Sequence, residues 1–88
     1  MLKEEFTIQN RLGLHARAAA RLVQTVNRFR SDVTIERDGL EVNGKSIMGL
    51  LMLAAPQGSK ILVAAGGDDA AEAMAAVRQL IDDKFGEE

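Results

Sequence analysis

The sequence contains no cysteine, no tryptophan and no tyrosine, and it has one histidine and one proline in 88 residues. Without cysteine the chain can form neither a disulfide framework nor a thiolate zinc site. One histidine is too few for the ligand clusters of catalytic metals, so we expect no metal site. Without tryptophan and tyrosine, and with its three phenylalanines placed for a core, the chain lacks the stacking platforms of many nucleic-acid-binding domains.

Long apolar runs and an export signal are also missing. The longest apolar run covers residues 47–56, which is far short of the roughly 20 residues that a membrane-spanning helix needs. The first five residues turn acidic after Lys3 and lack the apolar core of a secretion signal. Together with the absence of cysteine, these features predict a soluble cytoplasmic protein.

The remaining composition suits one small folded domain, residues 1–88. Hydrophobic residues make up 47% of the chain and charged residues 27%, which provides a core and a solvated surface. The net charge of −2 is uneven, because residues 1–30 carry six Lys/Arg and two Glu (+4) and residues 31–88 carry five Lys/Arg and eleven Asp/Glu (−6). The arginines of the first third either offer a site for a phosphate, an acidic partner or a nucleic acid, or form a solvated helix face.

Hydrophobic periodicity predicts the elements of the first half of the chain. A two-residue period over residues 2–9 predicts a strand. An apolar stripe over residues 16–27 predicts an amphipathic helix. Alternating residues at 32–36 and 40–42, separated by Asp38-Gly39, predict a hairpin.

The second half continues with a short helix, a strand and a long helix. Ser46 is a good N-cap for a helix over residues 47–53, and the branched residues of 60–65 predict a strand. Apolar residues recur every three or four positions from residue 70 to residue 85, and we expect Asp68 or Asp69 to cap this last helix.

Three apolar helix stripes require a common sheet face, so this element order predicts an α+β open sandwich. All three phenylalanines are expected to be structural. The expected core draws on Phe6, Ile8, Leu22, Val26, Val33, Ile35, Ile61, Val63, Val77, Leu80 and Ile81.

The one histidine, His15, lies directly before the first predicted helix. A helix start presents unpaired backbone N–H groups, here beginning at Ala16, and a partial positive charge, so it would stabilise a phosphate on His15. Gly13 can adopt conformations closed to other residues and let a partner's backbone approach, and the small Ala16 leaves the ring uncovered. An accessible imidazole is a competent nucleophile near neutral pH.

Arg17 strengthens the case for a phosphate at this position. A cation in the first turn opposes the helix dipole unless an anion lies nearby, and the planar guanidinium suits phosphate oxygens. His15 and Arg17 together suggest covalent phosphorylation of the histidine. The alternative is that His15 is a helix cap or a surface residue and that Arg17 is simply solvated.

The sequence lacks the motifs of an independent enzyme. There is no Gly-x-Ser-x-Gly elbow, and no second histidine that could act as a base, so we exclude a triad hydrolase. Neither the P-loop nor the Gly-x-Gly-x-x-Gly motif is present, so we expect no nucleotide pocket and no bound cofactor. A phosphoryl donor would have to come from a partner protein.

Two segments resemble one known family, HPr, the phosphocarrier protein of the bacterial phosphoenolpyruvate-dependent phosphotransferase system. Gly13-Leu14-His15-Ala16-Arg17 resembles its active-site loop, and Val42-Asn43-Gly44-Lys45-Ser46-Ile47-Met48-Gly49-Leu50 resembles the start of its second helix. The resemblance spans essentially the whole chain. It implies a four-stranded antiparallel sheet covered on one face by three helices, and a carrier of phosphoryl groups, not an enzyme.

The resemblance also implies how the carrier works. Enzyme I, charged from phosphoenolpyruvate, would phosphorylate His15 on Nδ1, Arg17 would steady the phosphoryl group, and a histidine of an EIIA-type protein would receive it. The implied docking surface consists of Ala16, Arg17, Ala20, Gln24, Ile47, Met48, Leu51 and Met52. Apart from the family, residues 47–52 have more apolar side chains than so short a helix can bury, unless Met48 and Met52 fill gaps in the core.

Three positions bear on regulation and on variation within the family. In many members the serine that matches Ser46 is phosphorylated by a dedicated kinase, HPr kinase/phosphorylase, whereas the N-cap interpretation of Ser46 needs no regulation. Ala18 stands where the family usually has proline, which frees a backbone donor and loosens the turn. Ala54 stands where the family often has glycine, which affects helix capping.

Several alternatives stay open. Within the family, a nitrogen-related or purely regulatory paralogue shares the histidine and the fold. From other classes, the chain could be a non-catalytic adaptor, or a nucleic-acid-binding domain that uses the N-terminal arginines, although its net charge is negative. We expect a monomer that binds no nucleic acid and does not insert into a membrane.

Overall fold

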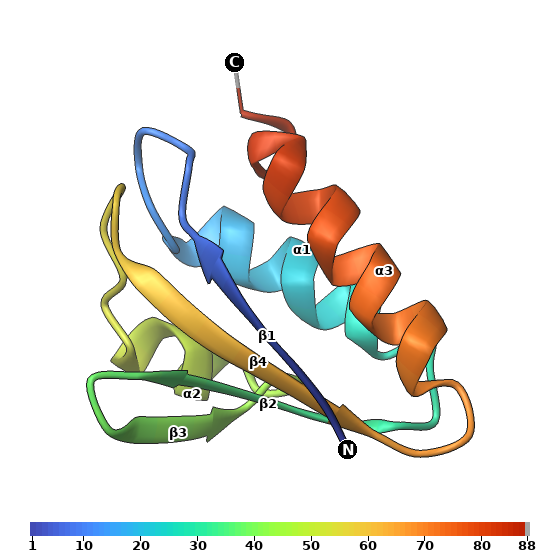
Figure 1. The fold of residues 1–88 in the computed structure, drawn as a ribbon. Coiled ribbons are helices and arrows are strands. Elements are labelled where there is room, and N and C mark those ends of the chain that lie inside the picture. Colours follow the sequence, from blue (N-terminus) through green and yellow to red (C-terminus); the bar gives the residue numbers. More distant parts are fainter. Residues whose placement is uncertain (88) are drawn as a thin grey trace.

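The elements follow the predicted order in the computed structural model, which describes residues 1–87 (Figure 1). They are β1 (Leu2–Thr7), α1 (Ala16–Val26), β2 (Asp32–Arg37), β3 (Leu40–Asn43), α2 (Ile47–Met52), β4 (Lys60–Gly66), α3 (Ala70–Asp82) and the short 3₁₀ turn η1 (Lys84–Gly86). Among these residues no helix has both the length and the apolar character needed to cross a membrane.

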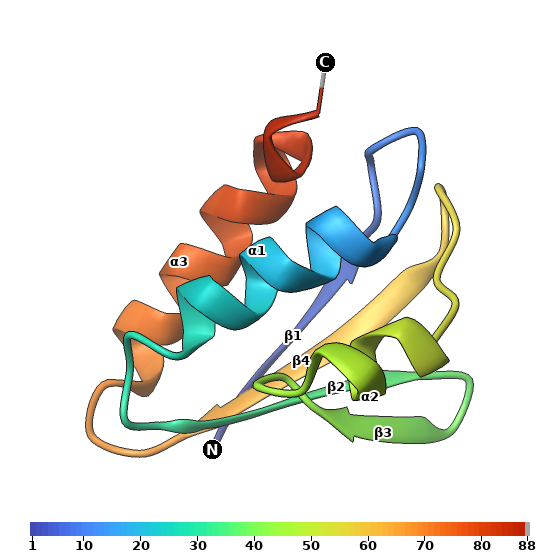
Figure 2. The ribbon, with the colours of Figure 1, turned by 180° about the vertical axis from the view of Figure 1, so that it is seen from behind.

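The strands pair into one antiparallel sheet in the order β1-β4-β2-β3. The central strand β4 pairs Ile61 with Phe6 of β1 and Val63 with Ile35 of β2. Because side chains alternate across a strand, this register gathers the apolar residues on one face. All three α-helices lie on that face (Figures 1 and 2), which confirms the predicted α+β open sandwich.

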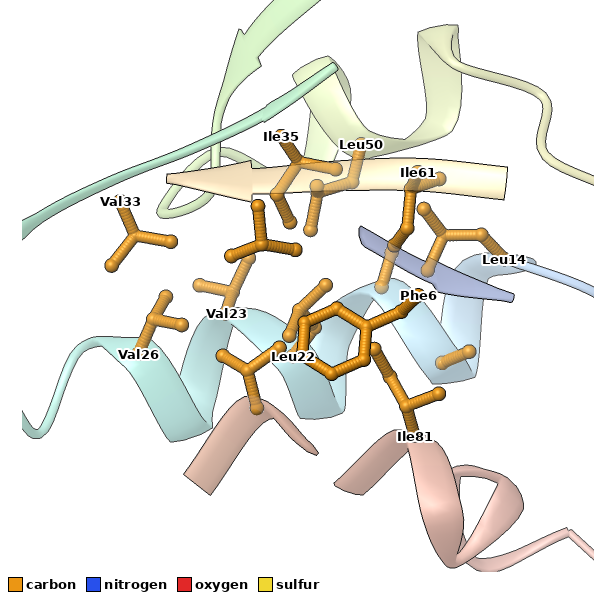
Figure 3. Packing of buried hydrophobic residues seen from close by; sticks show 14 of the residues in the cluster. Phe6, Leu14, Leu22, Val23, Val26, Val33, Ile35, Leu50, Ile61 and Ile81 are labelled. Carbon is orange, nitrogen blue, oxygen red and sulfur yellow. The ribbon is translucent and has the colours of Figure 1, made fainter. Parts of the chain in front are cut away.

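The core lies between this sheet face and the helices, as Figure 3 shows, where Ile61 and Phe6 of the sheet face Leu22, Val26 and Ile81 of the helices below them. Each fully buried aliphatic side chain contributes about 2 kcal/mol by leaving water. The expected core residues are buried except Leu80, which is only partly buried at the edge of the α3 stripe. Phe6 and Phe85 are buried, and Phe29 is partly buried against the core.

The last helix is shorter than its apolar pattern predicts. Helix α3 ends at Asp82, and Phe85 lies in η1 with a left-handed backbone, φ 55°. Two acidic residues, Asp82 and Asp83, oppose the helix dipole at this end and favour termination there. Phe85 is nevertheless buried, with 2% of its surface exposed. The turn therefore brings this side chain into the core, as a longer helix would have done.

Helix α3 begins after one of the two expected residues, Asp68 or Asp69, but not with the side-chain contact that usually makes aspartate a cap. Asp69 occupies the N-cap position, but its carboxylate makes no capping hydrogen bond. It accepts hydrogen bonds from the backbone N–H groups of Arg30 and Ser31, both at 2.9 Å, and from the Ser31 hydroxyl at 2.5 Å. These donors, the Ser31 hydroxyl foremost, lower the pKa of Asp69 to about 2 and tie the α1–β2 loop to the start of α3.

We expect Asp69→Asn to lower Tm by about 5 °C at neutral pH, because the three donors lose their charged acceptor. The pKa of Asp69 is depressed from its ordinary 3.8 to about 2 in the folded chain, so its stabilisation is complete above the ordinary value and is lost as the pH falls towards 2. Thermal unfolding followed by circular dichroism should show the two proteins converging below about pH 4. A gap of constant size down to pH 2 would contradict this account.

Ala54 adopts a backbone conformation that favours glycine. It follows Leu53, the C-cap of α2, and has φ 49°, while its N–H donates to the carbonyl of Leu51 at 3.1 Å. A left-handed residue directly after a helix is a common C-terminal cap, and glycine fills it without the Cβ contact that alanine makes. This geometry explains why glycine is suited to the position.

We expect Ala54→Gly to raise the free energy of unfolding by about 0.5 kcal/mol, because relief of the left-handed strain exceeds the added entropy of the unfolded chain. Gly58 is a matched control in the same loop, with φ +88° and open space where a Cβ would lie. There Gly58→Ala should lower the free energy of unfolding by about 1 kcal/mol. Urea denaturation measures the free energy of unfolding of both variants. An Ala54→Gly variant that is less stable than the wild type would contradict the prediction.

Candidate functional site

His15 is the N-cap residue of α1. Its backbone is extended, with φ −80° and ψ −179°, and its carbonyl accepts the N–H of Ala19 at 2.8 Å. The side chain makes no capping hydrogen bond, and 30% of its surface is exposed. The ring is therefore not a helix cap, and it is open to solvent on one side.

The loop before His15 is fastened to the segment after α2. Gly13 has φ +69°, and a Cβ there would lie 2.5 Å from the carbonyl oxygen of Ala55. The next residue, Leu14, is buried and donates its N–H to the same oxygen at 2.8 Å. The expectation that Gly13 admits a partner's backbone is wrong, because its own chain already occupies that space.

The first turn of α1 offers free backbone donors beside the ring. Within residues 1–87 the N–H groups of Ala16, Arg17 and Ala18 form no hydrogen bond, and the first turn has no acidic residue. Proline at position 18 would remove one of these donors, whereas Ala18 retains it. The helix start therefore combines unpaired donors with the positive end of the helix dipole.

Arg17 is exposed, and it forms no ion pair within the described part of the chain. It shares an open pocket of about 690 Å³ with His15. The pocket is lined by Leu12, His15, Arg17, Phe85, Gly86 and Glu87.

A carboxylate that the sequence analysis did not identify faces the histidine. Oε2 of Glu87 lies 3.6 Å from Nε2 of His15 and accepts a hydrogen bond from Nδ2 of Asn10 at 2.9 Å. Oε1 of Glu87 accepts the backbone N–H of Leu12 at 3.1 Å. These donors, that of Asn10 foremost, lower the pKa of Glu87, so the carboxylate is ionised at neutral pH.

No local signal in the sequence identifies Glu87 as a neighbour of His15, or Asn10 as the donor that holds Glu87. Gly86 indicates a turn after the last helix, but it does not say where the following residue points. Asn10 lies in a loop, where the hydrophobic residues show no regular spacing that could predict a contact. Asn10 and Glu87 are 77 positions apart in the chain.

Helix α2 buries only Leu50 and leaves its other apolar side chains exposed. Met48 and Met52 are 72% and 65% exposed, so the interpretation that they fill gaps in the core is wrong. Helices α1 and α2 are in contact. Of the expected docking residues Ala20 is half-buried, and the exposed ones are Ala16, Arg17, Gln24, Ile47, Met48, Leu51 and Met52.

Ser46 caps α2 as predicted. Its Oγ accepts the N–H of Gly49 at 3.0 Å, and its carbonyl accepts the N–H of Leu50 at 3.0 Å. The residue is half-buried at the helix start. The neighbouring Lys45 is turned away from the cap, because its Nζ donates to the carbonyl of Phe29 at 3.0 Å.

Comparison with known proteins gives consistent matches over the whole chain. The family model for the PTS HPr component phosphorylation site matches residues 2–83. Phosphocarrier protein HPr of Xylella fastidiosa (strain Temecula1) is 50% identical over 88 residues, covering 100% of this chain and 99% of that protein. Phosphocarrier protein HPr of Neisseria meningitidis serogroup B is 51% identical over 87 residues, with coverages of 99% and 98%.

A solved structure agrees with these sequence matches. HPr-C-His from Thermoanaerobacter tengcongensis superimposes with a TM-score of 0.96 at 46% identity, covering 100% of this chain and 99% of that one. The fold, the two motifs and the relatives therefore point the same way. The chain belongs to the HPr family, the phosphocarrier proteins of the phosphotransferase system.

Proposed function

We propose that this phosphocarrier accepts a phosphoryl group from phospho-Enzyme I on Nδ1 of His15 and passes it to a histidine of an EIIA-type protein. The observation that carries the proposal is the position of the His15 ring, which lies uncapped and part-exposed beside free backbone donors. In this proposal the single domain of residues 1–88 works in the cytoplasm as a monomer, and it turns over only with partner enzymes.

The chemistry follows from the electrostatics of the helix start. The lone pair on Nδ1 attacks phosphorus while the P–N bond of the donor breaks, and the donor imidazole keeps that electron pair. The incoming group is anionic, so the free N–H groups of the first turn and the dipole of α1 stabilise it. Arg17 lines the same pocket and supplies a planar cation for two phosphoryl oxygens.

The exposed apolar residues of α2 support the proposed docking surface. Apolar side chains that a helix leaves uncovered beside a reactive residue are typical of an interface, and methionine adapts to more than one partner. Ala16, Ala20 and Gln24 extend this surface along α1, which contacts α2. A surface used in turn by Enzyme I and by an EIIA-type protein needs this adaptability.

Ser46 is a second proposed site of modification, by an HPr kinase/phosphorylase. Its Oγ already accepts the Gly49 N–H, so a phosphate there keeps an acceptor for the α2 start. The same phosphate adds negative charge next to Ile47 and Met48, which are exposed and apolar. This change would weaken docking of partners without altering His15.

We expect the wild-type chain to take up one acid-labile phosphoryl group when it is incubated with phosphoenolpyruvate and Enzyme I, and His15→Ala to take up none. Intact mass spectrometry before and after brief acid treatment measures both proteins. Circular dichroism of the variant checks that the fold survives. The proposal fails if the native Enzyme I leaves the wild type unmodified, or if His15→Ala is modified to the same extent.

We expect Arg17→Ala to lower kcat/KM for phosphoryl transfer by about 100-fold, because it removes a charged donor from the transferring group. Arg17→Lys should recover part of this loss, since lysine keeps the charge but not the planar fork. Arg30→Ala is the matched control, an exposed arginine beyond the far end of α1. Rapid-quench kinetics measures kcat/KM for each variant. Equal losses of kcat/KM in the Arg17 and Arg30 variants would refute a specific role for Arg17 in transfer.

A further inference from the structure

We propose that Glu87 is a positioning residue for phosphoryl transfer, whose carboxylate holds the proton on Nε2 of His15 and balances the positive charge of the ring once Nδ1 carries the phosphoryl group. This inference rests on the proposed function and deepens it, because it assigns a partner to the second ring nitrogen. It concerns the contact between Glu87 and His15 at 3.6 Å.

The carboxylate of Glu87 is held in place from two sides. Nδ2 of Asn10 donates to Oε2 at 2.9 Å, and the backbone N–H of Leu12 donates to Oε1 at 3.1 Å. Only 17% of the Glu87 side chain is exposed, against 30% for His15. A carboxylate with both oxygens occupied and most of its surface covered stays close to Nε2 without a large entropy cost at the moment of reaction.

The buried amide of Asn10 is committed to this arrangement. Asn10 is 0% exposed, and its Nδ2 donates both to Glu87 and to the carbonyl of Gly13, the latter at 2.7 Å. Its Oδ1 has no hydrogen-bond partner among the described residues. Turning the amide over would place Oδ1 against two oxygens. An unpaired buried acceptor costs free energy and calls for an explanation, and holding Glu87 supplies one.

The backbone before Glu87 is strained in a way that directs this residue towards α1. Lys84 and Phe85 have φ 56° and 55°, although neither is glycine, and Gly86 follows with φ 75°. Buried Phe85 anchors the turn, and Gly86 lies so close to Arg21 that a Cβ would be 2.2 Å from Nη1. In Figures 1 and 2 the segment after α3 lies at the same end of the molecule as the β1–α1 loop. Strain of this kind persists where the surrounding structure imposes it, often at functional sites.

This geometry assigns different tasks to the two ring nitrogens of His15. A carboxylate beside Nε2 favours the tautomer with the proton there, which leaves the lone pair on Nδ1 for attack on phosphorus. After the donor's P–N bond breaks, the ring carries the phosphoryl group on Nδ1 and the proton on Nε2, so it is cationic. Onward transfer returns the electron pair to Nδ1 and leaves the ring neutral with its Nε2 proton in place.

The same carboxylate repels the phosphoryl group, so the two effects must be compared by charge as well as by distance. Glu87 faces Nε2 at 3.6 Å, whereas the phosphoryl group is bonded to the other nitrogen and lies farther away. Arg17 and the free N–H groups of the first turn also offset its charge. With the phosphoryl charge offset in this way, the nearer protonated ring dominates the interaction with Glu87, because Coulomb energy falls with distance.

The test is the equilibrium of phosphoryl exchange between phospho-Enzyme I and this chain. Glu87→Gln keeps the size of the side chain and removes its charge, and we expect it to lower the exchange constant about fivefold, the upper end for a part-exposed ion pair. Glu87→Asp, which keeps the charge, should lie between this variant and the wild type. Glu41→Gln removes one charge from an exposed position on β3 and should leave the constant unchanged.

Rapid quenching followed by separation of the two phosphoproteins measures the exchange constant, and thermal unfolding confirms that each variant is folded. A merely structural role for Glu87 would change Tm and leave the exchange constant of the folded variant unaltered. An unchanged or increased constant in Glu87→Gln overturns the inference while leaving phosphorylation of His15 intact. A wild-type chain that takes up no phosphoryl group from its Enzyme I overturns both proposals together.

Discussion

The backbone contact between the β1–α1 loop and the segment after α2 determines where the histidine lies. Gly13 approaches the carbonyl of Ala55 more closely than any residue with a Cβ could, and Leu14 donates its N–H to that carbonyl. Because Leu14 is buried, the direction of the backbone at the start of α1 is fixed, and His15 is the N-cap residue. The His15 ring is therefore placed by two loops that meet, one before α1 and one after α2.

Much of the fold could be predicted from the sequence, because it depends on local patterns. The two-residue period of β1 and the apolar stripe of α1 are readable from neighbouring residues, and one sheet face is the only surface that can bury three stripes. The end of α3 could not be predicted in this way. Phe85 fits the helical period, yet it reaches its buried position through a left-handed turn. Hydrophobic spacing specifies that a residue is buried, but not which backbone path buries it.

In the candidate site, too, the features that depend on residues close in sequence could be predicted, and the contacts between residues distant in sequence could not. His15 and Arg17 are adjacent in one short motif, so residue chemistry and helix electrostatics suggest their joint task. Asn10 and Glu87 meet only because the chain folds back after α3, and Asp69 reaches Ser31 in a similar way. A contact between loops that are distant in sequence leaves no periodic trace, so reasoning from local patterns misses it.

Apart from Asp38 in the β2–β3 turn, the non-glycine residues with left-handed φ among the described residues lie in the two segments that flank His15. Ala54, Lys84 and Phe85 are non-glycine residues with left-handed φ, and the first lies next to the carbonyl that holds Leu14, while the others precede Glu87. Each such residue costs free energy that a glycine would avoid. Burial of Phe85 and Leu14 supplies the compensation. The core of this small domain therefore stabilises two unfavourable loop conformations beside the part-exposed His15 ring, in addition to the sheet and the helices.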